Sequence, residues 1–538
     1  MMNPNKSIDR TLECYGEAKA RRTKYNSIME EAGQYCWPAA QDMVHNAEHT
    51  EGLQRTVDLY DSTALMAAYR MTSGIFTYLM PVGAKWFEFV AQDYETNNNS
   101  VMKEWLSIAG ELAHKEIWRS NFQREMFITI RSMIVFGTGV ISVELIDGEL
   151  VFKSHHIGSM FFDENSKGEI DTAYRQIFYT ARQAMQEFKR DSNLGKSLDK
   201  AIKSKKLNEK FEFVHVCAPN KDFDSSKLGA DKKKVKSVYI NVTDKHEVKT
   251  GGFDDLPYVV ARFSKVPHEI MGRGPAIEIL PEIKMLNRMK KTFLEAAEKS
   301  CNPPVIAEDD GVVGQPVTEA NGMIYIRSGA MKPEALKTGI NTQLNAEVIA
   351  QQQEVVREGF FYNDFQALAN HRNMSATEAV ERVEESIVHI APQIVSHNKE
   401  TNSPIISRSL NLLIEAKKIP PPPIEFDADI VYQGRLALAM SNVQTNAIEA
   451  TLAKWAPYEE RMNVFANVNG HKAFRTSWLN AGAPADSLRP EDEVLAEEQE
   501  IAALQKASAE AEIGANAAKA YKNVSQAAEA GSLAEQLV

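Results

Sequence analysis

Two long helical segments that flank a short strand-rich insert limit what this 538-residue chain can fold into. From Ile277 to Ala297, apolar residues recur every three or four positions, which places them on one face of a helix. Pro275 suits the first turn, where its missing N–H costs nothing. Pro303 and Pro304 prevent the helix from continuing, so it spans about 25 residues, or about 40 Å.

The second helical segment is expected at residues 341–362, and short strands between the two helices are expected at 305–306, 312–313 and 323–326. Two long helices joined by a small β-rich module form a hairpin that can project from a body. An apolar stripe on such an outlying helix must be buried.

Residues 1–265 are predicted to form an α+β body. Helices are expected at 1–35, 58–78, in two pieces over 100–136 that separate near Ser120, and at 180–201. The pair Asp147-Gly148 predicts a tight turn between two strands, because this dipeptide favours the turn whose twist matches paired strands. We expect one antiparallel sheet from strands at 140–146, 149–153, 159–162, 170–177, 211–217, 237–242 and 258–263, with a further strand at 86–90.

The C-terminal part is predicted to be mostly helical. Helices are expected at 379–395 and 403–417, and a short strand at 427–433 could join the N-terminal sheet. A helical region at 434–482 has Trp455, Phe465 and Trp478 as expected core anchors. Residues 491–538 form an Ala/Glu/Gln-rich helix whose apolar content is too small for a core, so it is either solvated or packed by neighbouring copies.

Four motifs follow one another along the chain: Asp61-Ser-Thr63 through Leu79-Met-Pro81 to Trp86-Phe87; Phe136-Gly-Thr-Gly-Val-Ile-Ser-Val143; Met271-Gly-Arg-Gly-Pro-Ala276 followed by Leu280-Pro-Glu-Ile-Lys-Met-Leu-Asn287; and Met374-Ser-Ala-Thr-Glu-Ala379 with Glu381-Arg382. In this order and spacing they resemble the head-to-tail connector, or portal, proteins of short-tailed bacteriophages. The resemblance covers roughly residues 25–488. Met271 departs from it, since an aromatic residue is expected there, and the Ala/Glu-rich tail lies outside it.

The resemblance implies an α+β portal fold, with a ring of about twelve identical subunits around a channel for double-stranded DNA. It assigns a wing, a helical stem hairpin, a small β-rich clip and a helical C-terminal crown. On this sequence the expected regions are the wing body (1–265), first stem helix (266–302), clip (303–340), second stem helix (341–364), channel loop (365–376), long wing helix with returning strand (377–435), and crown with Ala/Glu-rich tail (436–538).

The resemblance also implies where DNA and partner proteins bind. The channel loop would present His371, Arg372 and Asn373 to the DNA, with an exposed polar loop as the alternative. The first stem helix would present Lys284, Arg288, Lys291 and Lys299, for which salt bridges between subunits are the alternative. Expected partners are the terminase motor, a tail adaptor at the clip, and capsid and scaffolding proteins. The expected location is the portal vertex of the virion, after assembly in the host cytoplasm.

The formal net charge of −12 argues against a DNA-binding protein that reads sequence, because such proteins usually carry a basic patch. A conduit that lets DNA slide is compatible with an acidic wall, which repels phosphates, although the charge could also serve solubility alone. Four cysteines without a C-x-x-C pair predict reduced thiols: Cys14, Cys36, Cys217 and Cys301. No signal-peptide pattern and no apolar run of about 18 residues is present, so we expect an intracellular protein outside the membrane.

We expect no enzyme, cofactor or metal. The Gly272-Arg-Gly274 motif lacks the third glycine and the preceding strand of a dinucleotide-binding motif, and no phosphate-binding loop occurs elsewhere. The alternative is a metal-dependent nuclease or NTPase component of a packaging system, using Asp309-Asp310 or Glu384-Glu385. Adjacent acids on a helix lie about 100° apart, which makes a poor shared metal site. A coiled-coil scaffold protein is a third possibility, disfavoured because sustained heptads are absent.

Overall fold

A computed structural model describes residues 4–44, 52–81, 85–93, 99–188, 194–221, 223, 233–301, 305–306, 326–329, 331, 334–335, 342–363, 392–393, 395–424, 428–432, 449–458, 468–480, 488–489 and part of 494–522. The chain divides into two compact units, Met1–Ala439 and Met440–Val538. Helices and small antiparallel sheets make up the first unit, which is the α+β class that the sequence predicts. Within this described part, no helix combines the length and apolarity that crossing a bilayer requires.

The first third of the larger unit is mainly helical. Its helices are α1 (Pro4–Thr23), α2 (Asn26–Cys36), the 3₁₀ turn η1 (Pro38–Ala40), α3 (Thr63–Leu79), α5 (Ser100–Arg119) and α6 (Phe122–Phe136). The side chain of Asn99 accepts a hydrogen bond from the backbone N–H of Val101, which caps the start of α5. Gly137 ends α6 with φ of 78°, a left-handed conformation that favours glycine. The helix expected over 1–35 is interrupted between α1 and α2.

The strands of the body form three separate sheets rather than the single sheet expected. The five-stranded sheet has the order β4-β5-β6-β7-β8, the three-stranded sheet has the order β3-β2-β9, and β1 pairs with β14. The strands are β1 (Phe87–Ala91), β2 (Thr138–Ile146), β3 (Glu149–His155), β4 (Met160–Glu164), β5 (Ile170–Thr180), β6 (Lys210–Pro219), β7 (Val235–Asn241), β8 (His246–Phe253), β9 (Tyr258–Arg262) and β14 (Ala428–Tyr432).

The turn prediction is confirmed, and so is the strand near residue 430. Asp147 and Gly148 join β2 to β3 with φ of 51° and 80°. β14 pairs antiparallel with β1, with Phe89 opposite Ile430. Sequence analysis missed β8 because this edge strand is polar, has no buried face, and contains Gly251 and Gly252, which are poor strand formers.

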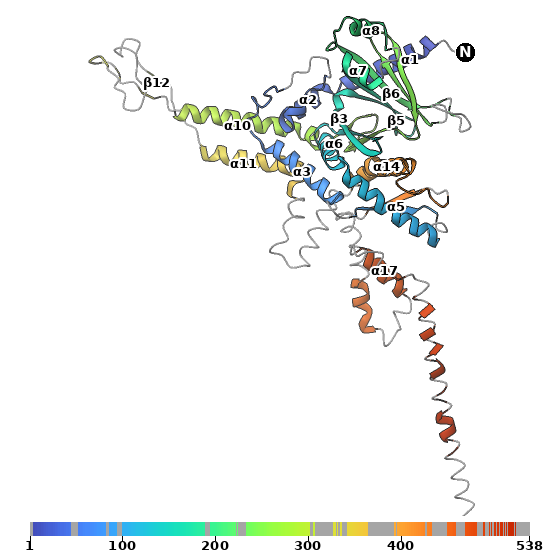
Figure 1. The fold of residues 1–538 in the computed structure, drawn as a ribbon. Helices are drawn as coiled ribbons and strands as arrows, with labels where there is room; N and C mark the ends of the chain where they lie inside the picture. Colours follow the sequence, from blue (N-terminus) through green and yellow to red (C-terminus); the bar gives the residue numbers. More distant parts are fainter. Residues whose placement is uncertain are drawn as a thin grey trace, which may run out of the picture. The chain divides into compact units, whose positions relative to one another are not determined.

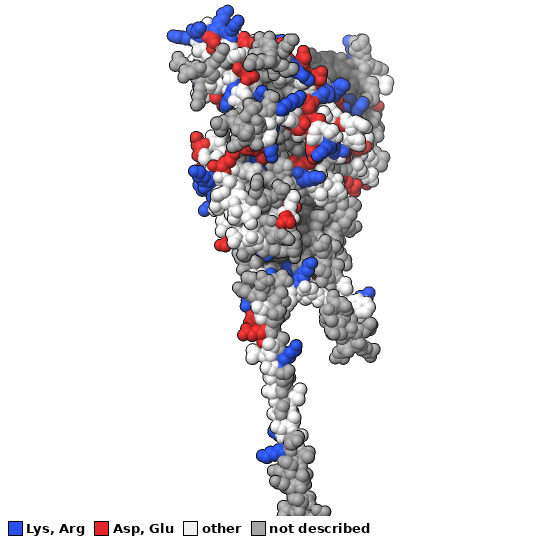
Figure 2. Space-filling model, turned by 90° about the vertical axis from the view of Figure 1, so that its right-hand side faces the viewer, with Lys and Arg blue, Asp and Glu red and all other residues white. Residues whose placement is uncertain are grey.

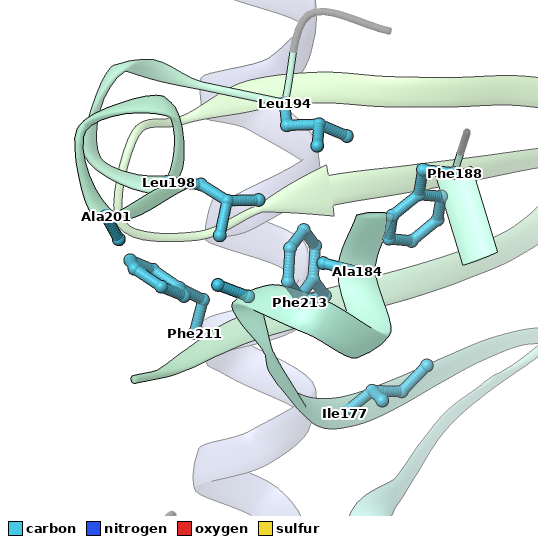
Figure 3. Packing of buried hydrophobic residues seen from close by; sticks show 9 residues of the cluster. Ile177, Ala184, Phe188, Leu194, Leu198, Ala201, Phe211 and Phe213 are labelled. Atoms are coloured by element: carbon cyan, nitrogen blue, oxygen red, sulfur yellow. The ribbon is translucent and has the colours of Figure 1, made fainter. Parts of the chain in front are cut away.

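Helices cover both faces of the five-stranded sheet. On one face, Tyr15 and Ala18 of α1 pack against Val214 and Val216 of β6. On the other, helices α7 (Ala181–Phe188) and α8 (Lys196–Lys203) pack over the same strand. There, a cluster of buried apolar side chains joins the two helices to β5 and β6, as Figure 3 shows: Ile177, Ala181, Ala184, Phe188, Leu194, Leu198, Ala201, Phe211 and Phe213.

A layer of buried polar side chains lies where the five-stranded and three-stranded sheets meet. The ring nitrogens of His215 (β6) lie 2.6 Å from the Tyr258 hydroxyl of β9 and 2.8 Å from the Ser237 hydroxyl. Burial, reinforced by Arg175 and Lys249, lowers the pKa of His215 to about 3. The imidazole is therefore neutral at physiological pH, and it joins the two sheets by hydrogen bonds.

The predicted helical hairpin is confirmed. It starts with α9 (Pro275–Glu278) and α10 (Leu280–Cys301) and returns through α11 (Thr342–Gly359), which lies beside α10 as the pair extends away from the sheets (Figure 1). The single first helix that we expected is broken at Ile279, because Pro281 restricts the residues before it and belongs in the first turn of a new helix.

The described part of the insert lies at the far end of the hairpin, where β12 (Val305–Ile306) pairs with β13 (Glu334–Ala335) (Figure 1). The expected strand at 312–313, and the one at 323–326 apart from Ile326, lie outside the described residues. Two further short strands, β10 (Ser264–Lys265) and β11 (Gly272–Arg273), pair just before α9.

After the hairpin, a single turn of π-helix, η4 (Asn398–Asn402), leads directly into α14 (Ser403–Glu415). His397, just before this turn, is fully buried, and neither of its ring nitrogens has a hydrogen-bond partner among the described residues. It lines a cavity of about 10 Å³ together with Met71, Ile75 and Phe361. Burial lowers the pKa of His397 to about 4. This uncompensated polar ring destabilises the fold.

The smaller unit contains α17 (Gly470–Asn480) and the 3₁₀ turn η5 (Ala456–Tyr458). Trp455 is 42% exposed, so its predicted role as a core anchor is wrong for the isolated chain. Trp478 is half-buried and packs against Phe474 at a ring-centroid distance of 5.8 Å. The third expected anchor, Phe465, lies outside the described residues.

Charges of both signs are interspersed over the surface of the larger unit. Figure 2, which views it from the side away from the α10–α11 hairpin, shows Lys and Arg side chains among Asp and Glu side chains. The described surface on this side therefore offers no continuous basic track, in agreement with the net charge of −12.

The two buried histidines give opposite expectations for substitution by methionine. His397→Met removes a ring that has no hydrogen bond to the described residues, so we expect the free energy of unfolding at pH 8 to rise by about 1–3 kcal/mol. The unfolded chain protonates this imidazole near pH 6.5 and the folded protein only near pH 4, so it reduces stability as pH falls between these values. The variant should therefore also lose less stability between pH 8 and pH 5.

His215→Met is the matched comparison, because it leaves Tyr258 and Ser237 without their partner. We expect it to lower the free energy of unfolding at both pH values, by about 2 kcal/mol or more. Urea denaturation of the two variants and the unmodified protein measures this. An equal loss of stability in both variants would contradict the prediction.

Candidate functional site

Two glycine-containing motifs meet at the base of the hairpin, where it leaves the body. The side-chain oxygen of Thr138 accepts a hydrogen bond of 2.9 Å from the N–H of Gly272. A Cβ atom added to Gly137 would overlap the carbonyl oxygen of Gly272, and one added to Gly272 would overlap that of Gly137. A Cβ atom added to Gly274 would likewise overlap the carbonyl oxygen of Ile134 in α6. These glycines serve backbone packing, and they fix the direction in which α9 starts.

Asn287 attaches α10 to the loop before α3. Its side-chain oxygen accepts hydrogen bonds from the N–H groups of Tyr60, at 2.8 Å, and Asp61, at 3.2 Å. Its side-chain nitrogen donates to the carbonyl oxygen of Asp58 at 2.9 Å. Because Asn287 is 8% exposed, these bonds are largely shielded from water. Asn287, the last residue of the motif that begins at Met271, thus binds Asp61, the first residue of the motif that ends at Phe87.

Asp61 also connects the returning helix to this base. One carboxylate oxygen accepts a hydrogen bond from the N–H of Thr63, at the start of α3, and the other accepts one from the side chain of Gln353 in α11, each at 2.8 Å. At the end of α11, a Cβ atom on Gly359 would lie 2.7 Å from a methyl carbon of Ile279. Both helices of the hairpin are therefore fixed to the body at their base.

The four cationic residues predicted on the first stem helix lie on α10 in two different settings. Lys284 forms a salt bridge of 2.8 Å with Glu31 of α2, which raises the pKa of Lys284. The Lys291 ammonium lies 5.3 Å from the centre of the Tyr60 ring. Arg288 and Lys299 are exposed. Two of the four are thus bound to the body of their own chain, whereas Arg288 and Lys299 face solvent.

The three residues predicted in the channel loop, His371, Arg372 and Asn373, lie outside the described residues. The same holds for Asp309-Asp310 and Glu384-Glu385, the acidic pairs considered for a metal-dependent enzyme. Among the residues that are described, no group of three or more His, Cys, Asp or Glu side chains is arranged to hold a metal ion.

The apolar stripe of α10 is buried at its base and exposed further out. Ile283 and Leu286 are at most 3% exposed, whereas Leu294, two turns beyond Leu286, is 45% exposed. The hairpin and the neighbouring helix α3 together leave six large apolar side chains 42–48% exposed: Met66, Tyr69, Met285, Leu294, Val348 and Val355. The folded chain alone does not bury this surface.

Sequence analysis missed a buried arginine that connects the body to the segment after the hairpin. Arg262 of β9 forms two hydrogen bonds with the carboxylate of Glu400 in η4, at 3.1 and 2.9 Å, and also pairs with Glu164. Burial lowers the pKa of Arg262, but the two carboxylates outweigh this effect and keep it above its ordinary value. The pairing joins residues 138 positions apart, so no local sequence pattern signals it.

The comparisons with known proteins agree with one another. The family model described as "Bacteriophage head to tail connecting protein" matches residues 9–488. The chain is 24% identical to the "Probable portal protein" of Bordetella phage BPP-1 over 451 residues, which covers 81% of this chain and 80% of that protein. It is 23% identical to the "Portal protein" of Salmonella phage epsilon15 over 490 residues, covering 86% and 87%.

The glycine contact at the base of the hairpin predicts a strong effect from a single methyl group. Gly272→Ala places a carbon against the Gly137 carbonyl, so we expect the free energy of unfolding to fall by about 1–3 kcal/mol. Gly251→Ala in β8 is the matched control, because no atom lies within 4 Å of the added carbon. It should change stability by less than about 0.5 kcal/mol in the same urea denaturation. Equal effects would refute the packing role of Gly272.

Proposed function

The chain belongs to the family of bacteriophage head to tail connecting proteins, and we propose that its α10–α11 hairpin is the stem that lines the DNA channel of a portal ring. A protein of this family is a component of the virion capsid and works with capsid and tail proteins as an assembled ring. Through such a ring, double-stranded DNA passes into the head during packaging and out of it during ejection. The role is structural.

The incompletely buried hairpin carries this proposal. Its base is fixed by Asn287 and Asp61, yet apolar side chains on both of its helices, such as Leu294 and Val355, remain in water. A closed ring resolves this, since each hairpin then packs against its two neighbours through unlike faces. Exposed apolar patches of this kind commonly mark protein–protein contacts.

The remaining regions follow from this position of the stem. We propose residues 1–265 and 377–435 as the wing, with Arg262 and Glu400 joining its two parts. Residues 266–302 and 341–364 are the stem helices, 303–340 the clip, 365–376 the channel loop, and 436–538 the crown and tail. The pairing of β12 with β13 supports a small β module at the clip.

Specific partners are part of the same proposal. We expect about twelve subunits in the ring. The clip would bind a tail adaptor, and the ring would also contact the terminase motor and scaffolding proteins. Arg288 and Lys299 are the stem cations best suited to DNA, because Lys284 is bonded to Glu31 and Lys291 lies over Tyr60. His371, Arg372 and Asn373 remain proposed contacts of the channel loop.

Ring formation is tested by placing charge on the exposed apolar surface. We expect Leu294→Lys combined with Val355→Lys to prevent closed rings, because the contact between hairpins would then bury two ammonium groups without partners. The unmodified protein should form rings, and so should Val101→Lys, a control on α5 where the side chain is already 59% exposed. Native mass and negative-stain images measure this. Rings from the double variant would contradict the stem assignment.

The DNA-contact proposal separates the four stem cations into two pairs. We expect Arg288→Gln with Lys299→Gln to form normal rings but to change the amount of DNA retained in filled heads. Lys284→Gln with Lys291→Gln removes the same charge from groups already bonded within the chain, so DNA retention should stay unchanged. The DNA content per head, measured for both variants, tests this difference. Identical retention in the two variants would remove Arg288 and Lys299 from the channel.

A further inference from the structure

The surface of α8 carries positive charge that the hairpin and the channel do not explain. Between residues 195 and 210 the chain has six lysines and two acidic residues, in a protein whose net charge is −12. Five of these lysines, all exposed, are here named the α8 lysine patch: Lys196, Lys200, Lys203, Lys205 and Lys206. In Figure 2, Lys and Arg side chains lie at the upper edge of the larger unit, at the height where Figure 1 places α8.

The packing of α8 fixes the outward direction of the patch. Leu198 and Ala201 point into the buried cluster with Phe211 and Phe213, so the opposite side of this two-turn helix faces solvent (Figure 3). Lys196, Lys200 and Lys203 recur at intervals of four and three residues, which puts them on one helix face. At its end the chain turns back through Lys205, with φ of 57°, and the N–H of Lys206 bonds the Ala201 carbonyl at 2.9 Å. Five ammonium groups are thereby concentrated around one helix.

No acidic side chain of the described residues neutralises these charges. None of the five ammonium groups has an acidic partner in the described part of the structure. In contrast, Lys265, Lys284 and Lys418 each form a salt bridge with a glutamate. Like charges three or four residues apart on a helix repel one another, so the patch opposes folding unless an anion binds it. The patch is therefore complementary to a polyanion.

The residue types favour the phosphate backbone of double-stranded DNA. A lysine ammonium binds phosphate as a point charge, without the planar fork through which arginine recognises a guanine edge. Single-stranded nucleic acids need aromatic side chains on which bases stack, and the exposed residues of segment 195–210 include none. Contacts of this kind give affinity that depends on salt and not on sequence.

We propose that the α8 lysine patch binds the backbone of double-stranded DNA outside the channel, independently of its sequence. The proposal depends on the proposed function only for the source of the DNA. Figure 1 shows α8 at the end of the body beyond the five-stranded sheet, on a different part of the larger unit from α10 and α11. The patch thus gives each subunit a DNA contact separate from the one that lines the bore.

The test uses relaxed, closed circular duplex DNA, which has no end and cannot thread through a closed ring. We compare the unmodified full-length protein with a patch variant, Lys200→Gln, Lys203→Gln, Lys205→Gln and Lys206→Gln. A control variant removes four exposed lysines elsewhere on the larger unit: Lys103→Gln, Lys115→Gln, Lys221→Gln and Lys417→Gln. Binding is measured by filter retention between 50 and 200 mM NaCl, and native mass is measured on each sample.

We expect the patch variant to bind DNA at least tenfold more weakly at low salt. The slope of log affinity against log salt concentration should decrease in magnitude by about 3–4, since each lost phosphate contact contributes about 0.9. The control variant should bind like the unmodified protein. Equal losses in both variants, or none in the patch variant, overturn the proposal. The proposal is also overturned if poly-glutamate displaces the circular DNA from the protein as strongly as linear duplex DNA of equal total charge does. Native mass reports ring formation separately, so a failure of the ring proposal can be told apart from a failure of DNA binding by the patch.

Discussion

The close contact between the backbones around Gly137 and Gly272 is the constraint on which the rest of the structure depends. It holds the last turn of α6 and the start of β2 against the segment that becomes α9. A side chain at either position would separate these segments and change the direction of the hairpin. Asn287 and Asp61 then continue the attachment along α10 and α11. Rigidity at the base is what a stem requires if identical copies are to meet at the same angle.

Beyond this base, the isolated chain leaves apolar and cationic side chains exposed that other molecules could cover. The exposed apolar side chains on the hairpin and on α3 remain in water in the isolated subunit, and so does Trp455 in the smaller unit. The α8 lysine patch lacks acidic partners in the described structure. Apolar surface favours neighbouring subunits, whereas unpaired ammonium groups favour phosphates. The hairpin and the α8 lysine patch lie on different parts of the larger unit, so a partner on one does not cover the other.

The junction after the hairpin combines strong pairing with local imperfection. Arg262 binds Glu400 within the π-helical turn, while His397, Thr401 and Asn402 beside it keep buried polar atoms that have no partner in the described part of the chain. A π-helical turn inserts a residue into a helix and changes which side chains face the core. The arginine therefore holds in place a turn whose neighbouring polar groups are poorly satisfied. The segment that follows the hairpin is therefore attached to the body at the expense of local stability.

The sequence by itself determined the α+β class, the hairpin and most strands, because helical and strand periodicity, the Asp147-Gly148 turn and the proline breaks act locally. The order of the motifs also determined the family. Only the tertiary structure decided that the strands form separate sheets and that the glycine motif packs against backbone. It also decided that Lys284 and Lys291 are held within their own chain, whereas Arg288 and Lys299 face solvent. These outcomes depend on contacts between residues far apart in the chain, which no local pattern encodes.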